Sequence, residues 1–339
     1  MSDAKFQMFD LQRFADTTVP VALTQKAWGK QLFEAVISEI YLSTLMGTSS
    51  DSVIQKLENL KKEAGDQIIV PLRLKLKGDG VMDDADVEGN EEEMIFDDYT
   101  VQVHEYAHGV RLKGNLEEQK TQIKLRQAAK DSLKDWATEK IDKLLINALT
   151  ASPTTNRLVY AGGKTATNLL TDSDKMATDL ISLAKRKAKL AYPKIRQVKV
   201  KGKLYYIMLM HDWQFRDLKT DEKWLNAQKD ANIRGDENPI FSGMEGIWDG
   251  VVIKAWENVH VKAEGASSAN VGKALLLGAQ AGVLGVAQET AWREKSFNYG
   301  KRAGFETDFI VGAGKPHFTV ETADTDFGVL QVQTGAKAD

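Results

Sequence analysis

The segment from Asn115 to Thr150 constrains the fold of this chain more than any other. In its second half the apolar residues recur at steps of three, four and one, the spacing of one helical face: Leu133, Trp136, Ala137, Ile141, Leu144, Leu145, Ala148 and Leu149. Asn115 with Glu118 forms an N-terminal capping pattern, and Pro153 ends the helix. Such a helix is roughly 54 Å long. Because a compact chain of 339 residues is roughly 50 Å across, we expect the helix to cross the whole molecule as a spine.

Two strand-like stretches precede the predicted spine and flank a long acidic segment. Residues 67–72 are apolar around Pro71, which predicts an edge strand, and residues 99–112 alternate in polarity. No Lys or Arg occurs between Gly78 and Val110. The central acidic residues are Asp83, Asp84, Asp86, Glu88, Glu91, Glu92 and Glu93. The segment is either a solvated loop or the tip of a projecting hairpin that contacts a basic neighbour, since so long a hairpin has little core of its own.

A basic stretch overlaps the end of the next predicted helix, which spans residues 172–190. It contains no acidic residue and includes Lys185, Arg186, Lys187, Lys189, Lys199, Lys201 and Lys203. Tyr192 is its only aromatic residue, so it lacks the stacking platform typical of single-strand nucleic-acid binders. A solvated face or a protein interface therefore fits this stretch better than a phosphate-binding surface.

Composition excludes several classes of protein. The chain has no Cys, which excludes disulfides, thiolate metal sites and a cysteine nucleophile. No stretch reaches the ~20 apolar residues needed to span a bilayer, and a net charge of -3 gives no overall attraction to nucleic acid. Residues 1–26 are either a frayed terminus or an arm that docks on another subunit. Residues 51–62 are predicted to be a short helix or an irregular segment. Helices and strands mix without a βα repeat, which predicts an α+β fold.

One motif points to metal chemistry. Residues His104 to His108 match the zinc-hydrolase pattern H-E-x-x-H, which requires a helix so that both histidines and the glutamate face one metal. Here the flanking residues alternate as in a strand, and Glu105 would point away from both histidines. We interpret the match as a coincidence and predict no catalytic, cofactor-binding or metal site. The remaining features are suited to contacts between copies of the chain.

The order of these features resembles that of the major capsid proteins of tailed bacteriophages, which have the Johnson (Hong Kong ninety-seven-like) fold, and in particular the podovirus N4-type major coat protein family. The resemblance covers nearly the whole chain. It is carried by Phe9-Asp10-Leu11-Gln12-Arg13-Phe14-Ala15, Gly78-Asp79-Gly80-Val81, Glu88-Gly89-Asn90-Glu91-Glu92, Tyr99-Thr100-Val101, Gly109-Val110-Arg111, the helix with Trp136, Glu139, Ile141 and Asp142, Phe297-Asn298-Tyr299-Gly300, Gly304-Phe305 and Phe327-Gly328-Val329-Leu330.

The resemblance implies a division of the chain. Residues 1–50 would form the N-terminal arm and 66–113 the extended hairpin, or E-loop. The peripheral domain would comprise residues 51–65, 114–170 with the spine at 115–150, and 300–339. Residues 171–299 would form the axial domain.

The resemblance also implies a function without enzymatic activity or cofactors. The protein would assemble into hexamers and pentamers of an icosahedral shell around double-stranded DNA, in a virion built in the bacterial host cytoplasm. Portal, scaffold or cementing proteins would be its other partners. The acidic tip would contact a basic surface of the next subunit near the basic stretch. Two alternatives are an encapsulin-type nanocompartment shell and, from another class, a zinc hydrolase that uses His104 and His108.

Overall fold

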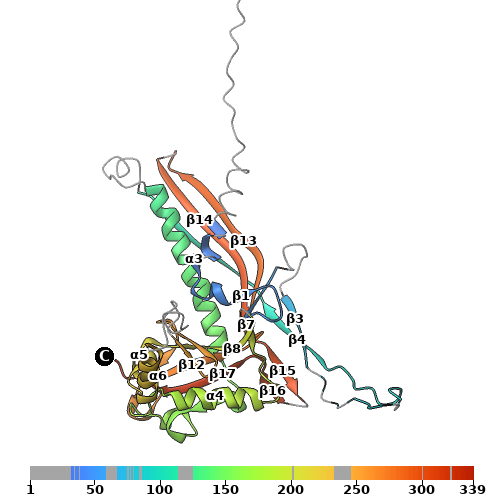
Figure 1. Ribbon diagram of the computed structural model, residues 1–339. Helices are drawn as coiled ribbons and strands as arrows, with labels where there is room; N and C mark the ends of the chain where they lie inside the picture. The colour runs from blue at the N-terminus through green and yellow to red at the C-terminus, as the bar shows by residue number, and fades with distance from the viewer. Residues whose placement is uncertain are drawn as a thin grey trace, which may run out of the picture.

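The computed structural model describes residues 32–33, 35–37, 39–58, 67–74, 76, 78, 80–83, 86–113, 125–200, 202–232, 246–299, 301–320 and 323–339. Its fold is α+β, as predicted. An upright part, made of one long helix beside a sheet, stands on a wider lower part, and a two-stranded hairpin projects from the place where the two parts meet (Figure 1). Most of the predicted N-terminal arm lies outside the described residues.

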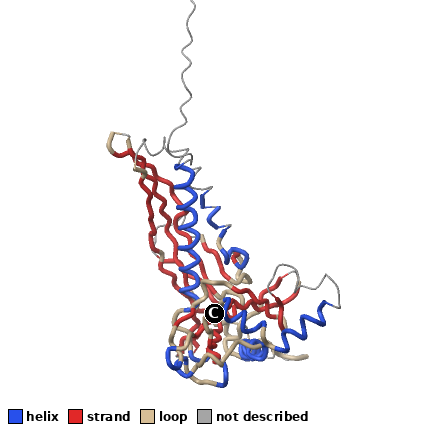
Figure 2. Tube along the Cα trace, turned by 90° about the vertical axis from the view of Figure 1, so that its left-hand side faces the viewer, coloured by secondary structure: helices blue, strands red, loops and turns tan. Residues whose placement is uncertain are grey.

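The upright part contains a five-stranded sheet with the strand order β1-β2-β13-β14-β5. Its strands are β1 (Met46–Gly47), β2 (Ile54–Leu57), β5 (His104–Arg111), β13 (Gly282–Phe297) and β14 (Arg302–Gly314). Helix α3 (Leu125–Thr150) runs along one face of this sheet, as both views show (Figures 1 and 2). Because the antiparallel strands β13 and β14 are long, the sheet extends along the whole described length of helix α3.

Helix α3 confirms the predicted spine over the residues that the structure describes. Its 26 residues correspond to a length of about 39 Å, and residues 114–124, with the predicted cap at Asn115, lie outside the described part. The buried positions repeat every four residues along one face, with Leu133, Ala137 and Ile141 almost fully buried. This stripe packs against the five-stranded sheet at its upper end and against both sheets at its lower end.

The lower part is built on an eight-stranded sheet with the order β6-β17-β12-β8-β10-β9, to which β7 and β11 add at β8 and β12. Its strands are β6 (Leu158–Tyr160), β7 (Val198–Val200), β8 (Lys203–Met210), β9 (Gly246–Trp248), β10 (Val251–Ala255), β11 (Val261–Lys262), β12 (Val271–Leu277) and β17 (Val329–Gly335). Short 3-10 turns connect elements at η1 (Tyr41–Leu45), η3 (Thr155–Arg157), η4 (Ala161–Gly163), η5 (Thr167–Leu169) and η7 (Ala266–Ser268). Helices cover one face: α4 (Thr178–Leu190), α5 (Asp212–Lys219) and α6 (Glu222–Asn232).

Alternation along β8 explains how one sheet serves two cores. Met208 and Met210 face the helices α4 to α6, whereas Ile207 and Leu209 face the core that contains the lower end of α3. Both sets are buried, so the strand reads as a continuous apolar run. Helix α4 begins at Thr178 rather than at residue 172, because the Asp221 carboxylate accepts hydrogen bonds from the Thr178 backbone and hydroxyl, both at 2.7 Å.

The two large sheets combine segments that lie far apart in the chain. Strand β13 lies in the five-stranded sheet beside α3, where it pairs with β14 along most of its length. Strand β17 lies in the eight-stranded sheet, where it pairs with β12 over seven positions. The chain therefore leaves the lower sheet after β12 and returns to it at β17. The domain names themselves stay a prediction.

One further expectation was wrong: residues 51–62 contain strand β2 rather than a short helix or irregular chain. Residues 54–57 pair parallel with the start of β13, and Val53 and Ile54 are buried. Strands β3 and β4 pair up to residue 102, and β5 then pairs with β14 over eight positions.

Candidate assembly surface

The projecting hairpin consists of β3 (Gln67–Arg73) and β4 (Phe96–Gln102), paired antiparallel over seven positions. Seven residues of strand extend about 23 Å, and residues 74–95 continue beyond them to a tip that lies away from both sheets (Figure 1). The sequence correctly predicted two strands around an acidic tip. Pro71 is tolerated in β3 because this strand pairs only with β4 in the described structure.

The described part of the tip exposes both acidic and large apolar side chains. Its exposed apolar residues include Met82 (79%), Val87 (61%) and Met94 (56%). Large apolar side chains exposed on a projecting loop are candidates for contact with a partner. The acids of the tip are evident in the sequence, whereas these apolar residues were not recognised there. They lie among charged residues, far from any predicted core.

The acidic residues shape the tip as well as charge it. Glu92 accepts a hydrogen bond from the Gly78 backbone at 2.6 Å, which ties the returning arm of the loop to the outgoing one. Glu91 accepts one from the Gly89 backbone at 2.7 Å within the turn. Asp83, Asp86, Glu88 and Glu93 are exposed, and Asp84 lies outside the described residues. The described acids therefore lie along one projecting loop.

Glycines in the five-stranded sheet hold the base of the hairpin. A Cβ at Gly285 would stand 2.4 Å from the Ile68 side chain, and a Cβ at Gly312 would stand 2.2 Å from the carbonyl oxygen of Gln102. Only glycine permits such close contact of the hairpin strands with β13 and β14. Val70, Leu72 and Val101 of the hairpin then complete a small buried cluster with Phe318 and Phe327.

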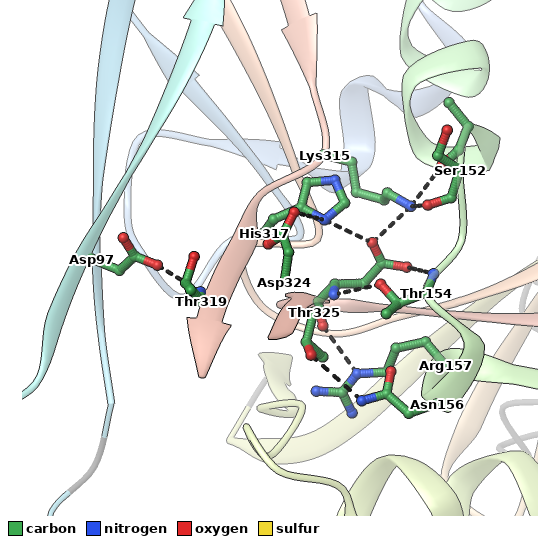
Figure 3. Close-up of polar contacts among 12 residues, drawn as sticks. Asp97, Ser152, Thr154, Asn156, Arg157, Lys315, His317, Thr319, Asp324 and Thr325 are labelled. Atoms are coloured by element: carbon green, nitrogen blue, oxygen red, sulfur yellow. Dashed lines mark hydrogen bonds and ion pairs between the residues drawn. The ribbon is translucent and has the colours of Figure 1, made fainter. Parts of the chain in front are cut away.

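A buried polar cluster joins the lower end of α3 to the β15–β16 turn beside the hairpin (Figure 3). Here β15 (His317–Val320) and β16 (Ala323–Asp326) pair antiparallel. Lys315 Nζ lies 2.8 Å from Asp326 Oδ1, and both side chains are almost fully buried. Lys315 also donates to the backbone oxygens of Ala151, at 2.7 Å, and Ser152, at the end of α3.

Other members of the cluster extend it in two directions. Arg157 is fully buried and donates to the backbone oxygens of Asp326 and Pro193, and burial lowers its pKa to about 10. Asp97 of the hairpin accepts a hydrogen bond from the Thr319 backbone at 2.7 Å. The end of the spine, the loop at Pro193 and the hairpin are therefore held in one fixed relation.

The predicted basic partner surface divides between helix α4 and the paired strands β7 and β8. Lys185, Arg186, Lys187 and Lys189 lie on α4, whereas Lys199 lies on β7 and Lys203 on β8. Lys201 lies outside the described residues. Lys185 is paired with Asp249 at 2.6 Å, and Lys187 donates to the Leu158 carbonyl oxygen at 3.2 Å.

The H-E-x-x-H residues lie on strand β5, as the alternating flanks predicted. Tyr106 and His108 face α3: the Lys140 ammonium lies 4.7 Å from the Tyr106 ring, and the His108 and Trp136 rings are 4.9 Å apart. Glu105 projects from the opposite face of the strand. In the described structure no group of three His, Cys, Asp or Glu side chains could hold a metal ion.

Comparisons with known proteins agree with these observations. The profile of the phage capsid protein family matches residues 16–152 and 139–338. The major capsid protein of Pseudomonas phage KPP25 is 26% identical over 357 aligned positions, which cover 91% of this chain and 94% of that protein. In the described structure no helix is both long and apolar enough to cross a membrane.

Solved capsid structures share the fold. The capsid of Ralstonia phage GP4 superposes with a TM-score of 0.78 and 28% identity, covering 88% of this chain and 91% of that one. The capsid of cyanophage Pam1 superposes with a TM-score of 0.73 and 24% identity, covering 88% and 92%.

Proposed function

We propose that this chain, which belongs to the phage capsid protein family, self-assembles into the shell of a phage head. The family match extends over nearly the whole chain, and the related proteins are capsid proteins rather than enzymes. The zinc hydrolase is disfavoured by this membership and by the strand geometry of His104 and His108. The encapsulin-type shell is disfavoured because the matched family and relatives are those of phages. The narrower N4-type assignment stays a prediction.

The observation that carries the proposal is the projecting hairpin with its exposed apolar and acidic tip. A monomer gains nothing by holding large apolar side chains in water at the end of a long arm. A second copy that covers them gains both apolar burial and charge pairing. The glycine contacts and the buried cluster at its base hold the hairpin in the extended direction that such a contact requires.

We infer further that the assembled units are hexamers and pentamers of an icosahedral shell that encloses double-stranded DNA. Assembly would take place in the bacterial host cytoplasm, with a portal protein and with scaffold or cementing proteins as additional partners. The support for these statements is family membership. DNA would be enclosed without sequence preference, and the net charge of -3 gives the chain no overall attraction to it.

Simultaneous neutralisation of the tip tests the proposal. Each exposed charge pair contributes only about 0–1 kcal/mol, so single changes should have little effect. We expect the triple variant Glu91→Gln, Glu92→Gln, Glu93→Gln to sediment mostly as small species while the wild-type chain sediments as large particles. The matched control is Asp131→Asn, Asp135→Asn, Glu139→Gln on the exposed face of α3. If the tip variant assembles like the wild type, with the same dependence on salt, the tip does not bind a neighbour.

A further inference from the structure

A cleft of about 460 Å3 lies between the base of the hairpin and the lower part of the molecule. The hairpin supplies Arg73 and Leu76, the loop after α4 supplies Lys194 and Arg196, and Leu204 of β8 forms part of the wall. The cleft is thus a space that the extended direction of the hairpin creates. Lys194 and Arg196 belong to the basic stretch identified in the sequence, whereas Arg73 lies outside it.

The cleft carries an excess of positive charge. Among its lining residues the cations are Arg73, Lys194 and Arg196, and Asp51 is the single acid. In the described structure neither Arg73 nor Lys194 forms an ion pair, and Asp51 lies 3.6 Å from Arg196. Arg196 Nε is buried without a hydrogen-bond partner among the described residues, whereas Nη2 donates to the Ser50 carbonyl oxygen at 2.9 Å and to Gln280 Oε1 at 2.5 Å. Burial lowers the pKa of Arg196; the charge of Asp51 opposes this effect and that of Arg73 adds to it. The positive charge of the cleft is therefore only partly compensated within the subunit.

Apolar side chains lie beside these cations. Leu76 and Leu204 are more than half exposed, and Tyr192 is 41% exposed at the mouth of the cleft. A ligand that matches this lining has several carboxylates followed directly by apolar side chains. The segment Glu91-Glu92-Glu93-Met94-Ile95 at the hairpin tip has this pattern, and Met94 and Ile95 are exposed.

We propose that this cleft receives the acidic tip segment, residues 91–95, of a second copy of the chain. In its own copy this segment is tied to the outgoing arm of the hairpin, because the Ile95 carbonyl oxygen accepts a hydrogen bond from the Leu74 backbone and Glu92 accepts one from the Gly78 backbone. The occupant therefore comes from a neighbour. Tip and cleft are different surfaces, and a contact between different surfaces repeats head to tail and closes into a ring when the rotation allows it. The inference rests on the proposed function and identifies the acceptor that the proposed function leaves open.

A second basic groove, at the upper end of the five-stranded sheet, fits the tip less well. Arg111 and Lys295 each lie 5.3 Å from the centre of the Phe297 ring, and Arg293 is paired with Asp308 at 2.9 Å. Glu294 and Glu306 also line this groove. Its positive charge is therefore largely compensated within the subunit, in contrast to that of the cleft.

Cross-linking tests the contact directly, because the chain has no Cys of its own. We expect particles of the double variant Glu93→Cys, Lys194→Cys to form, on oxidation, a ladder of covalent oligomers on a non-reducing gel. Each single variant should form no ladder. The matched control, Glu93→Cys with Lys295→Cys, places the second thiol in the upper groove and should also form none. Two outcomes would overturn the assignment of the cleft while leaving shell formation intact: particles of the Lys194→Cys double variant that form no ladder, or particles of the Lys295→Cys double variant that form one. Absence of particles from the wild-type chain would instead refute the proposed function.

Charge reversal provides an independent measurement. The variant Arg73→Glu, Lys194→Glu should lower the yield of particles at least about tenfold, because attraction to the tip becomes repulsion. Adding Glu91→Lys and Glu93→Lys to the same chain should restore the yield, since every tip then meets a reversed cleft. Circular dichroism verifies that each subunit folds. Full assembly of the cleft variant alone, or failure of the combined variant to recover when both are folded, would contradict the proposal.

Discussion

Replacement of Lys315 by Met should lower the free energy of unfolding by about 3–5 kcal/mol, the usual cost of removing one partner of a buried ion pair. Methionine keeps the apolar stem of the side chain but removes the ammonium group. Asp326, with an exposed fraction of 1%, would then lose its ammonium partner and keep, among the described residues, only the Thr154 backbone at 3.1 Å and His317 Nδ1 at 3.2 Å beside its carboxylate.

The structure supports the upper half of that range. Lys315 Nζ contacts the Asp326 carboxylate at 2.8 Å and also the backbone oxygens of Ala151 and Ser152, just beyond the end of α3. A cation at the C-terminal end of a helix adds about 0.3–1 kcal/mol, and more when it is partly buried. The surface pair of Lys143 with Glu139, more than half exposed at both side chains, should contribute only about 0–1 kcal/mol.

The assay is urea unfolding of dissociated subunits, followed by tryptophan fluorescence and far-ultraviolet circular dichroism. Lys143→Met is the matched control and should stay close to the wild type. The double variant Lys315→Met, Asp326→Asn should recover part of the loss, because it also removes the unpaired charge. A Lys315→Met variant as stable as the Lys143→Met control would refute the idea that this buried pair holds the spine to the β15–β16 turn.

Two more predictions concern the elements packed around the spine. Burial raises the pKa of Asp142 to about 6 from 3.8, so the folded state binds this proton more tightly than the unfolded chain. The free energy of unfolding should therefore fall by about 3 kcal/mol as the pH rises from 4 to 6. The variant Asp142→Asn should lack that part of the pH dependence in urea unfolding. If its stability varies with pH as that of the wild type does, the raised pKa of Asp142 is contradicted. Gly312→Ala places a Cβ 2.2 Å from the Gln102 oxygen and should cost about 1–3 kcal/mol, together with a loss of assembly. Gly78→Ala, which meets only the end of the Glu92 side chain, should cost less in the same unfolding assay; equal costs would contradict the docking of β4 on β14.

The spine and the hairpin could be predicted because their signals are local. The buried stripe of α3 repeats with the period of a helix, and Leu133, Ala137 and Ile141 occupy the positions that this period selects. The acidic tip stands out because residues between Gly78 and Val110 include no cation. Local patterns of this kind do not depend on where the rest of the chain lies.

The remaining features depend on contacts between distant segments. Strand β2 is short and was not recognised, because its pairing with β13 spans more than two hundred residues. In the sequence nothing links Lys315 to Asp326, or Arg73 to Lys194 of the basic stretch. Only the tertiary fold buries the first pair and brings the other two to one cleft.

Negative-stain microscopy of the full-length chain, expressed alone and purified, tests the central claim most directly. We expect closed particles, or rings of five or six copies under conditions that prevent closure. Single compact molecules at every protein concentration and salt concentration tried would contradict it.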